Sequence, residues 1–419
     1  MTEALLLLLS PYAAVLFMVW RSEEQMQESP EYQERKLFRC VFCGETVSQI
    51  HDFGMVALAG GFLKPEQFKA EKKYPLRLCY CLKCHAVQLA DRVEPDVMFR
   101  EYFYFSSANE TIRRHFREYA GDVIEKFHPK TVIEIGCNDG VLLTPLRDAG
   151  VRVIGVDPST TVPKGPDIIN DYFTPDIARK LGKVDVVIAN NVFAHISDIH
   201  TATVAVSQAM KDDGVFIMEA HYLGDMINDL QYDWIYHEHI YYYSLLSLEN
   251  HLAMHGLKVF DVKHVQTHGG SMRYYICKDD RATSQAVIAL RHNEKSVGLD
   301  QWGTYIGFSD RIKQHRKEIM ALSQGSKIVG YGASGRANAL IQYCGLDVAY
   351  IVDDAPAKHG YYTPGTHIPI YSREKLETDK PDQIVVFAWS YLEEIQSKCD
   401  LPMIVPFPSV RLIEKRNAA

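Results

Sequence analysis

Four cysteines near the N-terminus have the residue type and spacing of a metal site. Cys40 and Cys43 form one CxxC pair, and Cys81 and Cys84 form a second pair after 37 intervening residues. Each pair puts two thiolates on one tight turn, and four thiolates are the usual tetrahedral ligands of a zinc ion. Four protein ligands leave no position for water, so we predict structural Zn²⁺. Cys79 is an alternative ligand, and the residues between the pairs must form their own hairpin or loop.

A second group of residues has the pattern of a cofactor-binding turn. Residues 131–140 are an apolar strand that runs into a glycine-bearing turn, where a ligand can approach the backbone at the start of a helix. A dinucleotide site would have three spaced glycines, whereas this turn has two, which favours S-adenosylmethionine over NAD. A carboxylate ends the next apolar run, where it can accept hydrogen bonds from ribose hydroxyls. The predicted cofactor-binding residues are Glu134, Gly136, Asn138, Gly140, Asp157, Asn190 and Asn191.

A third cluster offers groups for acid–base chemistry. Tyr236, Glu238 and His239 supply a phenol, a carboxylate and an imidazole within four residues. The ordinary pKa of histidine lies near neutral pH, as an efficient general base requires. On composition alone, a set of partly exposed polar residues is an equal alternative. The isolated residues His195 and His268 are more typical of structural histidines.

The segments around these residues predict an α/β architecture. Short apolar runs alternate with amphipathic stretches from residue 131 onward, which is typical of a doubly wound parallel sheet. The predicted strands are Thr131–Ile135, Arg152–Val156, Val184–Ala189 and Val215–Glu219, with helices beginning near Asp139, Pro175 and His200. Residues 285–322 predict a helical connector. A second, smaller α/β domain follows, with strands at Lys327–Tyr331, Ala349–Val352, Ile384–Phe387 and Met403–Val405.

Composition and charge narrow the functional class. Lys and Arg total 45 against 53 Asp and Glu, and a formal net charge of -8 lacks the basic surface of a nucleic-acid-binding protein. The scattered positions of most other cysteines suggest a reducing compartment, so we expect a cytoplasmic protein. Residues 5–20 are almost entirely apolar but shorter than the roughly 20 residues that span a bilayer. A membrane tether there is therefore less favoured than a docked helix or a dispensable leader.

The chain after Phe38 also resembles the sugar C-methyltransferase family, which methylates nucleotide-bound deoxy-keto-hexoses. The most specific matches are Tyr236-His237-Glu238-His239 and the His-Gly-Gly-Ser segment at residues 268–271. The other matching segments are the paired CxxC motifs and residues 101–106, 134–143, 191–196, 242–244, 331–333 and 364–369. Gly335-Arg336 departs from the family pattern of a small residue followed by Lys, and the apolar leader has no counterpart.

The resemblance implies an activity, a substrate and residue roles. It implies an S-adenosylmethionine-dependent C-methyltransferase acting on a nucleotide-diphosphate keto-sugar, with His239 as the base. Methylating carbon requires a carbanion equivalent, which a neighbouring ketone stabilises as an enolate; Tyr236 or Tyr102 is then a candidate hydrogen-bond donor to the enolate oxygen. Glu238 is a candidate to bind a sugar hydroxyl or orient the imidazole. The alternatives are an O-methyltransferase of a sugar or other small molecule, and a non-catalytic zinc-containing binding protein.

The same resemblance implies the domain plan. A leader and polar linker (1–37) precede a zinc-binding module (38–106), a Rossmann-like methyltransferase domain (107–284), the helical connector (285–324) and a smaller Rossmann-like domain (325–419). The last domain has a glycine-rich turn followed by an aspartate pair, which is a weak nucleotide-binding pattern. Arg336 and Lys358 are candidate phosphate contacts there, and a purely structural role fits them equally well.

Overall fold

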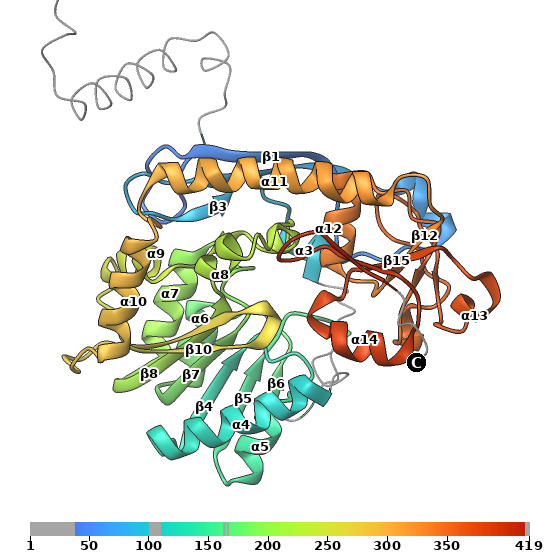
Figure 1. Cartoon of the computed structure of the whole chain (residues 1–419). Coiled ribbons are helices and arrows are strands. Elements are labelled where there is room, and N and C mark those ends of the chain that lie inside the picture. Colours follow the sequence, from blue (N-terminus) through green and yellow to red (C-terminus); the bar gives the residue numbers. More distant parts are fainter. Residues whose placement is uncertain (1–37, 100–109, 162–164, 166, 415–419) are drawn as a thin grey trace, which may run out of the picture. The chain divides into compact units, whose positions relative to one another are not determined.

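The computed structural model describes residues 38–99, 110–161, 165 and 167–414. Residues from Cys40 onward form one compact unit. Three sheets organise the compact unit, and each carries part of the predicted chemistry (Figure 1). The predicted residue Tyr102 and the apolar segment 5–20 lie outside the described residues.

The first sheet belongs to the zinc module and has the order β1-β2-β3-β9. Its strands are β1 (Ser48–Ala57), β2 (Lys73–Tyr80), β3 (Val87–Leu89) and β9 (Tyr241–Tyr242). β1 and β2 pair antiparallel, so the residues between the two CxxC motifs form the predicted hairpin. The hairpin's connection contains the short 3-10 helix Pro65–Ala70. β9 comes from far along the chain and joins the sheet through Val87 and Gln88, which fastens the zinc module to the central part of the protein.

The second sheet confirms the predicted doubly wound core. Its order is β10-β11-β8-β7-β4-β5-β6, with the five strands from β6 to β8 all parallel. The bounds are β4 (Thr131–Ile135), β5 (Arg152–Val156), β6 (Ile168–Ile169), β7 (Val184–Asn190), β8 (Met210–His221), β10 (Lys258–Val265) and β11 (Ser271–Cys277). Four of these match the predicted strands. The antiparallel pair β10 and β11 was not predicted, and β11 lies directly against β8.

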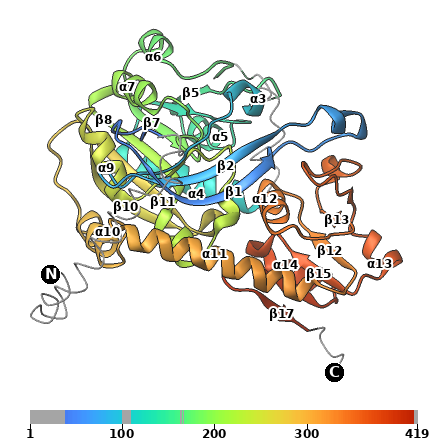
Figure 2. The same ribbon diagram turned by 90° about the horizontal axis from the view of Figure 1, so that it is seen from above.

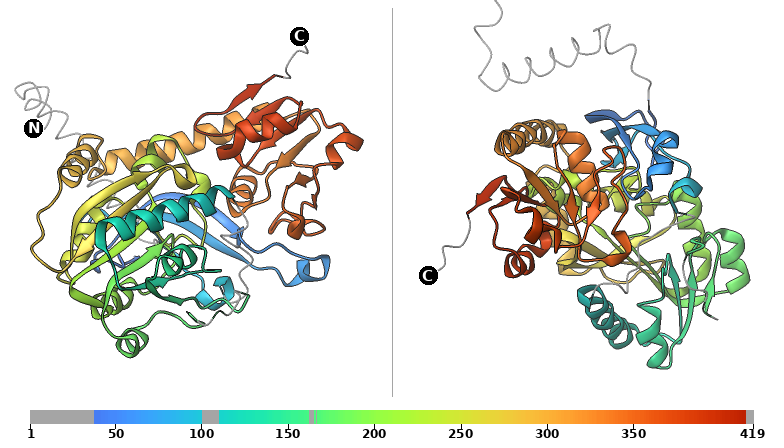
Figure 3. Two further views of the ribbon diagram at one scale, coloured as in Figure 1. Left: turned by 90° about the horizontal axis from the view of Figure 1, so that it is seen from below. Right: turned by 90° about the vertical axis from the view of Figure 1, so that its right-hand side faces the viewer.

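Helices flank this sheet, as Figures 1 and 3 show. They are α3 (Pro95–Phe99), α4 (Glu110–Phe127), α5 (Leu143–Asp148), α6 (Pro175–Leu181), α7 (Ile199–Ala209), α8 (Leu223–Asn228) and α9 (Leu245–Ala253). α6 and α7 begin at their predicted positions. α5 begins four residues after the predicted Asp139, because Asn138 and Gly140 have positive φ angles of 50° and 75° and hold the turn out of helical geometry.

The third sheet confirms the predicted smaller α/β domain. Its order is β14-β13-β12-β15-β16-β17. The strands are β12 (Ile328–Tyr331), β13 (Ile351–Val352), β14 (Ile370–Tyr371), β15 (Gln383–Val386), β16 (Met403–Val405) and β17 (Arg411–Ile413), and the helices are α12 (Gly335–Cys344), α13 (Lys375–Asp379) and α14 (Leu392–Lys398). The predicted connector is two helices, α10 (Gln285–Ser296) and α11 (Trp302–Ser323).

One apolar core joins the zinc module to the C-terminal sheet. α11 lies along β1, as Figures 1 and 2 show, and α12 packs against the same strand. Ile312 of α11, Leu76 of β2 and Ile341 of α12 are buried in a single hydrophobic cluster. The β1–β2 hairpin also reaches the C-terminal domain, where the rings of Phe68 and His367 stack with centroids 3.9 Å apart. Among the helices described, none combines the length and the apolar character needed to cross a membrane.

Candidate active site and zinc centre

The four predicted zinc ligands lie together. Cys40 Sγ is 3.4 Å from Cys84 Sγ, Cys43 Sγ is 3.5 Å from Cys81 Sγ, and all four sulfur atoms lie within 4.8 Å of one another. A tetrahedral centre with Zn–S bonds of about 2.3 Å has sulfur atoms about 3.8 Å apart, so the four thiols fit a zinc ion. Cys79 is buried but lies outside this cluster.

The cofactor turn after β4 is shaped by tight packing. Gly136 has a φ of 64°, and its amide donates to Val156 O at 2.8 Å. A Cβ atom at Gly136 would lie 2.3 Å from Cγ2 of Val192, so packing against this side chain requires glycine there. Gly140 has a φ of 75°, which other residues rarely adopt. A Cβ atom there would meet no neighbour closer than 3.8 Å, so the backbone conformation, and not the packing, favours glycine at this position.

Asp157 lies at the end of β5, next to the turn. Its carboxylate accepts hydrogen bonds from the backbone amides of Asn138 and Ser159, both at 2.9 Å. Burial raises the pKa of this carboxyl, and the two amide hydrogen bonds oppose that rise. Each carboxylate oxygen has a further lone pair, so the side chain can still accept hydrogen bonds from ribose hydroxyls.

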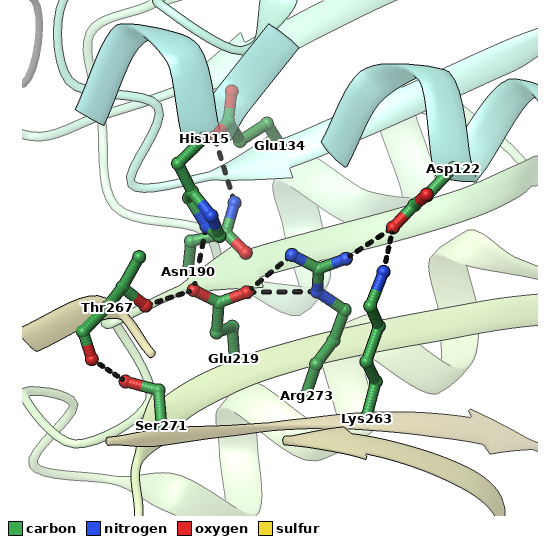
Figure 4. A network of polar contacts seen from close by, with 9 residues as sticks. All are labelled: His115, Asp122, Glu134, Asn190, Glu219, Lys263, Thr267, Ser271 and Arg273. Atoms are coloured by element: carbon green, nitrogen blue, oxygen red, sulfur yellow. Dashed lines mark hydrogen bonds and ion pairs between the residues drawn. The ribbon is translucent and has the colours of Figure 1, made fainter. Parts of the chain in front are cut away.

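Glu134 and Asn190 face each other across β4 and β7. Asn190 Nδ2 lies 3.4 Å from Glu134 Oε1, as Figure 4 shows. Glu134 Oε2 and Asn190 Oδ1 are buried and have no hydrogen-bond partner among the described residues. Burial raises the pKa of Glu134 well above its ordinary value. Buried polar atoms are normally satisfied, so these two oxygens are able to form hydrogen bonds with a bound polar group. Asn191 follows with a φ of 52°.

A hydrogen bond to the backbone fixes the orientation of the His239 imidazole. Its Nδ1 lies 2.8 Å from the carbonyl oxygen of Trp234, which can only accept, so Nδ1 carries the proton. In the neutral ring, Nε2 then has the lone pair that a general base needs. The His239 ring lies 4.2 Å from the ring of Tyr236 and 5.0 Å from that of His195, measured between centroids. Burial lowers the pKa of His195 to about 4, so this neighbour is neutral at pH 7.

The other two residues of the motif contact the zinc module. His237 Nε2 donates to Pro75 O in β2 at 3.1 Å, and the ring is only 1% exposed, which gives this histidine a structural role. Glu238 is also buried, and a Cβ atom at Gly60 would lie 2.2 Å from its Oε1. Gly60 belongs to the β1–β2 connection, so the zinc module helps to shape the surroundings of the predicted catalytic segment.

Hydrogen bonds to two backbone carbonyls bring this segment to the edge of the central sheet where the predicted cofactor residues lie. Ile240 N donates to Ala194 O at 2.7 Å, and the Tyr243 hydroxyl donates to Phe193 O at 2.9 Å. Residues 193–195 follow Asn190 and Asn191, at the end of β7, after one intervening residue. The two predicted groups, one for the cofactor and one for catalysis, therefore meet at the carboxyl ends of the parallel strands, where ligands of such sheets bind.

A buried ion network that the sequence did not predict lies beside this edge (Figure 4). Glu219 of β8 and Arg273 of β11, each 1% exposed, are paired with a 2.8 Å contact, and His115 of α4 lies 3.1 Å from Glu219. Asp122 of α4 bonds Lys263 at 2.5 Å and Arg273 at 3.4 Å. The network fastens α4 to the sheet. Arg273 is a charged residue within the largely apolar strand β11, which indicates a buried ion pair. Its partner Glu219 could not be identified from the sequence because it lies 54 positions away.

The two candidate phosphate contacts of the C-terminal domain are both paired with aspartates. Arg336 Nε lies 2.8 Å from Asp233 Oδ2, and its guanidinium carbon lies 4.6 Å from the ring centroids of both Trp234 and Trp389. Lys358 Nζ donates to a backbone carbonyl at 2.7 Å and lies 3.0 Å from an aspartate in the same domain. Arg336 thus lies beside the segment that carries His239.

Comparisons with known proteins agree with this geometry. Family models match a zinc binding domain at residues 40–99, a methyltransferase domain at 105–262 and a C-methyltransferase C-terminal domain at 266–402. The chain is 33% identical over 413 residues to C-methyltransferase NovU of Streptomyces niveus, which covers 91% of this chain and 98% of that protein.

Shorter and more distant likenesses were also found. Ubiquinone biosynthesis O-methyltransferase of Bartonella quintana is 29% identical over 102 residues, covering 22% of this chain and 41% of that protein. The crystal structure of magnesium protoporphyrin IX methyltransferase from Synechocystis PCC 6803 has a TM-score of 0.30 at 16% identity, covering 40% of this chain and 79% of that one. Because the likeness to NovU extends over nearly the full length of both proteins, the chain belongs to the C-methyltransferase family and is an S-adenosylmethionine-dependent methyltransferase with a zinc-binding N-terminal domain.

Proposed function

We propose that this C-methyltransferase acts on a nucleotide-linked keto-deoxy-sugar and removes a proton from the carbon next to the ketone before methylation. The observation that carries this proposal is the tautomer of His239. Its Nδ1–H donates to Trp234 O, so Nε2 is the basic nitrogen, and the segment lies at the edge of the sheet that carries the residues we assign to the cofactor. A carbon nucleophile must be generated by a base, and a fixed neutral imidazole is suited to this task.

The proposed reaction begins with proton transfer. The substrate C–H bond breaks, its proton moves to His239 Nε2, and the electron pair delocalises onto the ketone oxygen as an enolate. Bound S-adenosylmethionine supplies the methyl group from its sulfonium. The protein's contribution is to hold the carbon, the base and the donor in line, and such positioning accounts for much of the acceleration in bimolecular transfers.

We assign the other groups of the motif to the enolate and the sugar. Tyr236 lies against the His239 ring, so its hydroxyl is the candidate donor to the enolate oxygen. Glu238 is buried against Gly60 and is the candidate partner for a sugar hydroxyl. Tyr102 remains a second candidate for the enolate oxygen; it lies outside the described residues.

The cofactor is assigned to the turn after β4 and the neighbouring strand ends. Asp157 accepts the ribose hydroxyls in this proposal, and the unsatisfied oxygens of Glu134 and Asn190 face the polar groups of the donor. The backbone of Gly136, Asn138 and Gly140 forms the turn. Asn191, which follows the end of β7, is the last residue that we assign to cofactor binding.

The nucleotide end of the substrate is assigned to the side of the C-terminal domain that faces the catalytic segment. Of the two candidate phosphate contacts, Arg336 fits better because it touches Trp234, which neighbours His239. The ammonium group of Lys358 already has two partners inside its own domain, which supports a structural role for it.

The deciding experiment is deuterium exchange at the carbon that receives the methyl group. With a keto-sugar nucleotide and S-adenosylhomocysteine, the wild-type protein should exchange this hydrogen with solvent without turnover. His239→Asn should lower both exchange and methyl transfer by roughly a hundredfold to ten-thousandfold. S-adenosylhomocysteine affinity should be unchanged, because the donor site lies on other strand ends.

A matched control is His292→Asn, since His292 is an exposed histidine on α10. This variant should exchange and methylate like the wild type. Wild-type exchange in His239→Asn would contradict the assignment of the base and would make Tyr236 the next candidate.

The alternative, methylation of a sugar hydroxyl, predicts a different response to the substrate. An O-methyltransferase needs no ketone, so prior reduction of the ketone to an alcohol should leave its activity intact. Under our proposal the reduced substrate is not methylated. Membership in a C-methyltransferase family favours carbon as the acceptor.

A further inference from the structure

Three histidines outside the proposed catalytic site converge on one point. His200 is in the first turn of α7, His251 is on α9, and His255 follows α9 by two residues. One ring nitrogen of each lies within 4.8 Å of the corresponding nitrogens of the other two. The ring centroids are 4.9 Å, 5.0 Å and 5.0 Å apart, so the three rings form a nearly equilateral triangle.

The tautomer of His200 follows from its backbone partners. Its Nε2 lies 3.0 Å from Val41 O and 3.1 Å from Phe42 O. Both partners are carbonyl oxygens, which only accept, so Nε2 carries the proton. In the neutral ring, Nδ1 then has its lone pair directed into the triangle.

The tautomer of His251 follows from a hydroxyl group. Thr203 donates its hydroxyl proton to Ile199 O at 2.8 Å, so the same oxygen must accept from His251 Nε2, also at 2.8 Å. His251 Nδ1 therefore has a lone pair as well. This nitrogen is buried in a side chain only 1% exposed, and it has no hydrogen-bond partner among the described residues.

His255 closes the triangle from the more exposed side. Its Nε2 lies 2.8 Å from His200 Nδ1, so a proton on His255 Nε2 satisfies His200 but leaves His251 Nδ1 unpaired. A cation at the centre satisfies all three nitrogens at once. Imidazoles bound tetrahedrally with Zn–N bonds of about 2.0–2.1 Å have ring centroids about 5 Å apart, as the three rings do, and nitrogens about 3.3 Å apart. Binding an ion therefore replaces the 2.8 Å contact between His200 and His255 and moves their nitrogens apart by about 0.5 Å.

We propose that His200, His251 and His255 form a second metal site that binds Zn²⁺ through three imidazole nitrogens, with a water molecule in the fourth position. Three nitrogen ligands without a thiolate suit Zn²⁺ and related late divalent ions. Hydrogen bonds from the other ring nitrogen to a carbonyl or hydroxyl are the usual means of orienting metal-binding histidines, and His200 and His251 both have them.

This site is separate from the four-cysteine centre but linked to it. The two carbonyls that orient His200 belong to Val41 and Phe42, which lie between the zinc ligands Cys40 and Cys43. The Phe42 ring also packs on His251, with centroids 4.8 Å apart. A bound ion would therefore fix the ends of α7 and α9 against the first CxxC turn, and the inference does not depend on the substrate proposed above.

The test is the zinc content of the purified full-length protein after equilibration with micromolar free Zn²⁺. We expect two equivalents per chain in the wild type and in His292→Ala, the exposed-histidine control. His255→Ala should retain one equivalent. His255 is the variant of choice because its side chain is only partly buried, so its removal should leave the fold intact.

Cobalt substitution identifies which site remains. Four thiolates give intense sulfur-to-cobalt charge-transfer absorption, whereas three imidazoles and a water give only weak visible bands. The intense bands should persist in His255→Ala while one equivalent of Co²⁺ is lost. His251→Gln should behave in the same way. A single equivalent of metal in the wild type, or two equivalents in folded His255→Ala, would overturn the proposal.

Discussion

The turns after β4 and β12 share one backbone plan in two different sheets. In each, a glycine with positive φ, 64° at Gly136 and 96° at Gly332, donates its amide to the last residue of the neighbouring strand. An aspartate follows that strand in both cases, and each carboxylate accepts from an amide in the turn and from an amide two residues further on. The pairs are Asp157 with Asn138 and Ser159, and Asp353 with Ala333 and Ala355.

The two aspartates differ in the cation that faces them. Lys358 Nζ lies 3.0 Å from Asp353 and also donates to Ala333 O at 2.7 Å, so the second turn is filled by a side chain of its own domain. Asp157 forms no ion pair within the described part of the chain. The carboxylate of the second turn is therefore neutralised by a lysine, whereas the carboxylate of the first turn has no cation among the described residues.

The central sheet contains a second buried carboxylate, Glu219, which can be compared with Asp157 and Asp353. It is a buried carboxylate paired with Arg273, so it resembles Asp353 more than Asp157. Burial by itself raises the pKa of Glu219, but the His115 hydrogen bond and the Arg273 charge lower it to about 2. The pKa of Asp157 is instead raised by burial. Two buried carboxylates of one sheet thus shift in opposite directions.

The largest expected effect is the loss of the cation that pairs with Glu219. Arg273→Met keeps most of the side-chain volume and removes the arginine from the buried Glu219 carboxylate, which keeps only its contacts with His115 and Thr267, so the free energy of unfolding should fall by about 3 kcal/mol. Urea unfolding monitored by circular dichroism measures this loss. The double variant Arg273→Met, Glu219→Gln should recover much of it; equal stability of the single and double variants would mean that the ion pair is not the source.

Acid should remove the same contribution in the wild type. The folded-state pKa of Glu219 lies below its ordinary value of 4.5, so its stabilisation is fully present above about pH 4.5 and is lost as the pH falls towards 2. The loss should be about 3 kcal/mol at most. Unfolding free energies of wild type and Glu219→Gln should converge across this window, and a constant difference between pH 5 and pH 2.5 would contradict the assignment.

Removing the Asp157 carboxylate, which has no cation beside it among the described residues, should lower the affinity for the cofactor. Asp157→Ala should weaken S-adenosylhomocysteine binding by about 1.5–3 kcal/mol, as expected for lost hydrogen bonds to a charged group. Isothermal titration measures this change. Asp353→Ala is the matched control, because it removes the equivalent carboxylate from the second turn and should leave cofactor affinity unchanged. Equal losses of cofactor affinity in both variants would contradict the proposal that only the turn at Asp157 binds the cofactor.

Local patterns in the sequence predicted the parts of the site that are close together along the chain. Two CxxC pairs indicate a thiolate centre whatever their separation, because few other arrangements use both turns. The strands Thr131–Ile135 and Arg152–Val156 are mostly apolar because both faces of a parallel sheet are buried, and their charged residues are Glu134 and Arg152. The domain boundaries and the roles of the individual site residues remain predictions.

The features that the sequence did not reveal depend on pairings between distant residues. β9 is two residues long and joins the zinc module because Val87 pairs with Tyr242 and Gln88 pairs with Tyr241. No periodicity can signal such a bridge. The i, i+4 spacing of His251 and His255 is a weak sign of a metal site, but His200 lies about fifty residues earlier and is brought to them only by the packing of α7 and α9.

The smallest expected effect is the loss of Lys358. Lys358→Met leaves Asp353, which is 7% exposed, without its cation, but the lysine itself is partly exposed and two amides still bind the carboxylate. Unfolding free energy should therefore fall by only about 1–2 kcal/mol, less than for a fully buried pair. S-adenosylhomocysteine affinity should stay at the wild-type value, because this turn binds its own lysine. Adding Asp353→Asn to Lys358→Met should restore part of the stability, since the buried charge is removed. If Lys358→Met instead kept full stability but raised KM for the sugar nucleotide, Lys358 would be a phosphate contact, and the two turns would both be ligand sites.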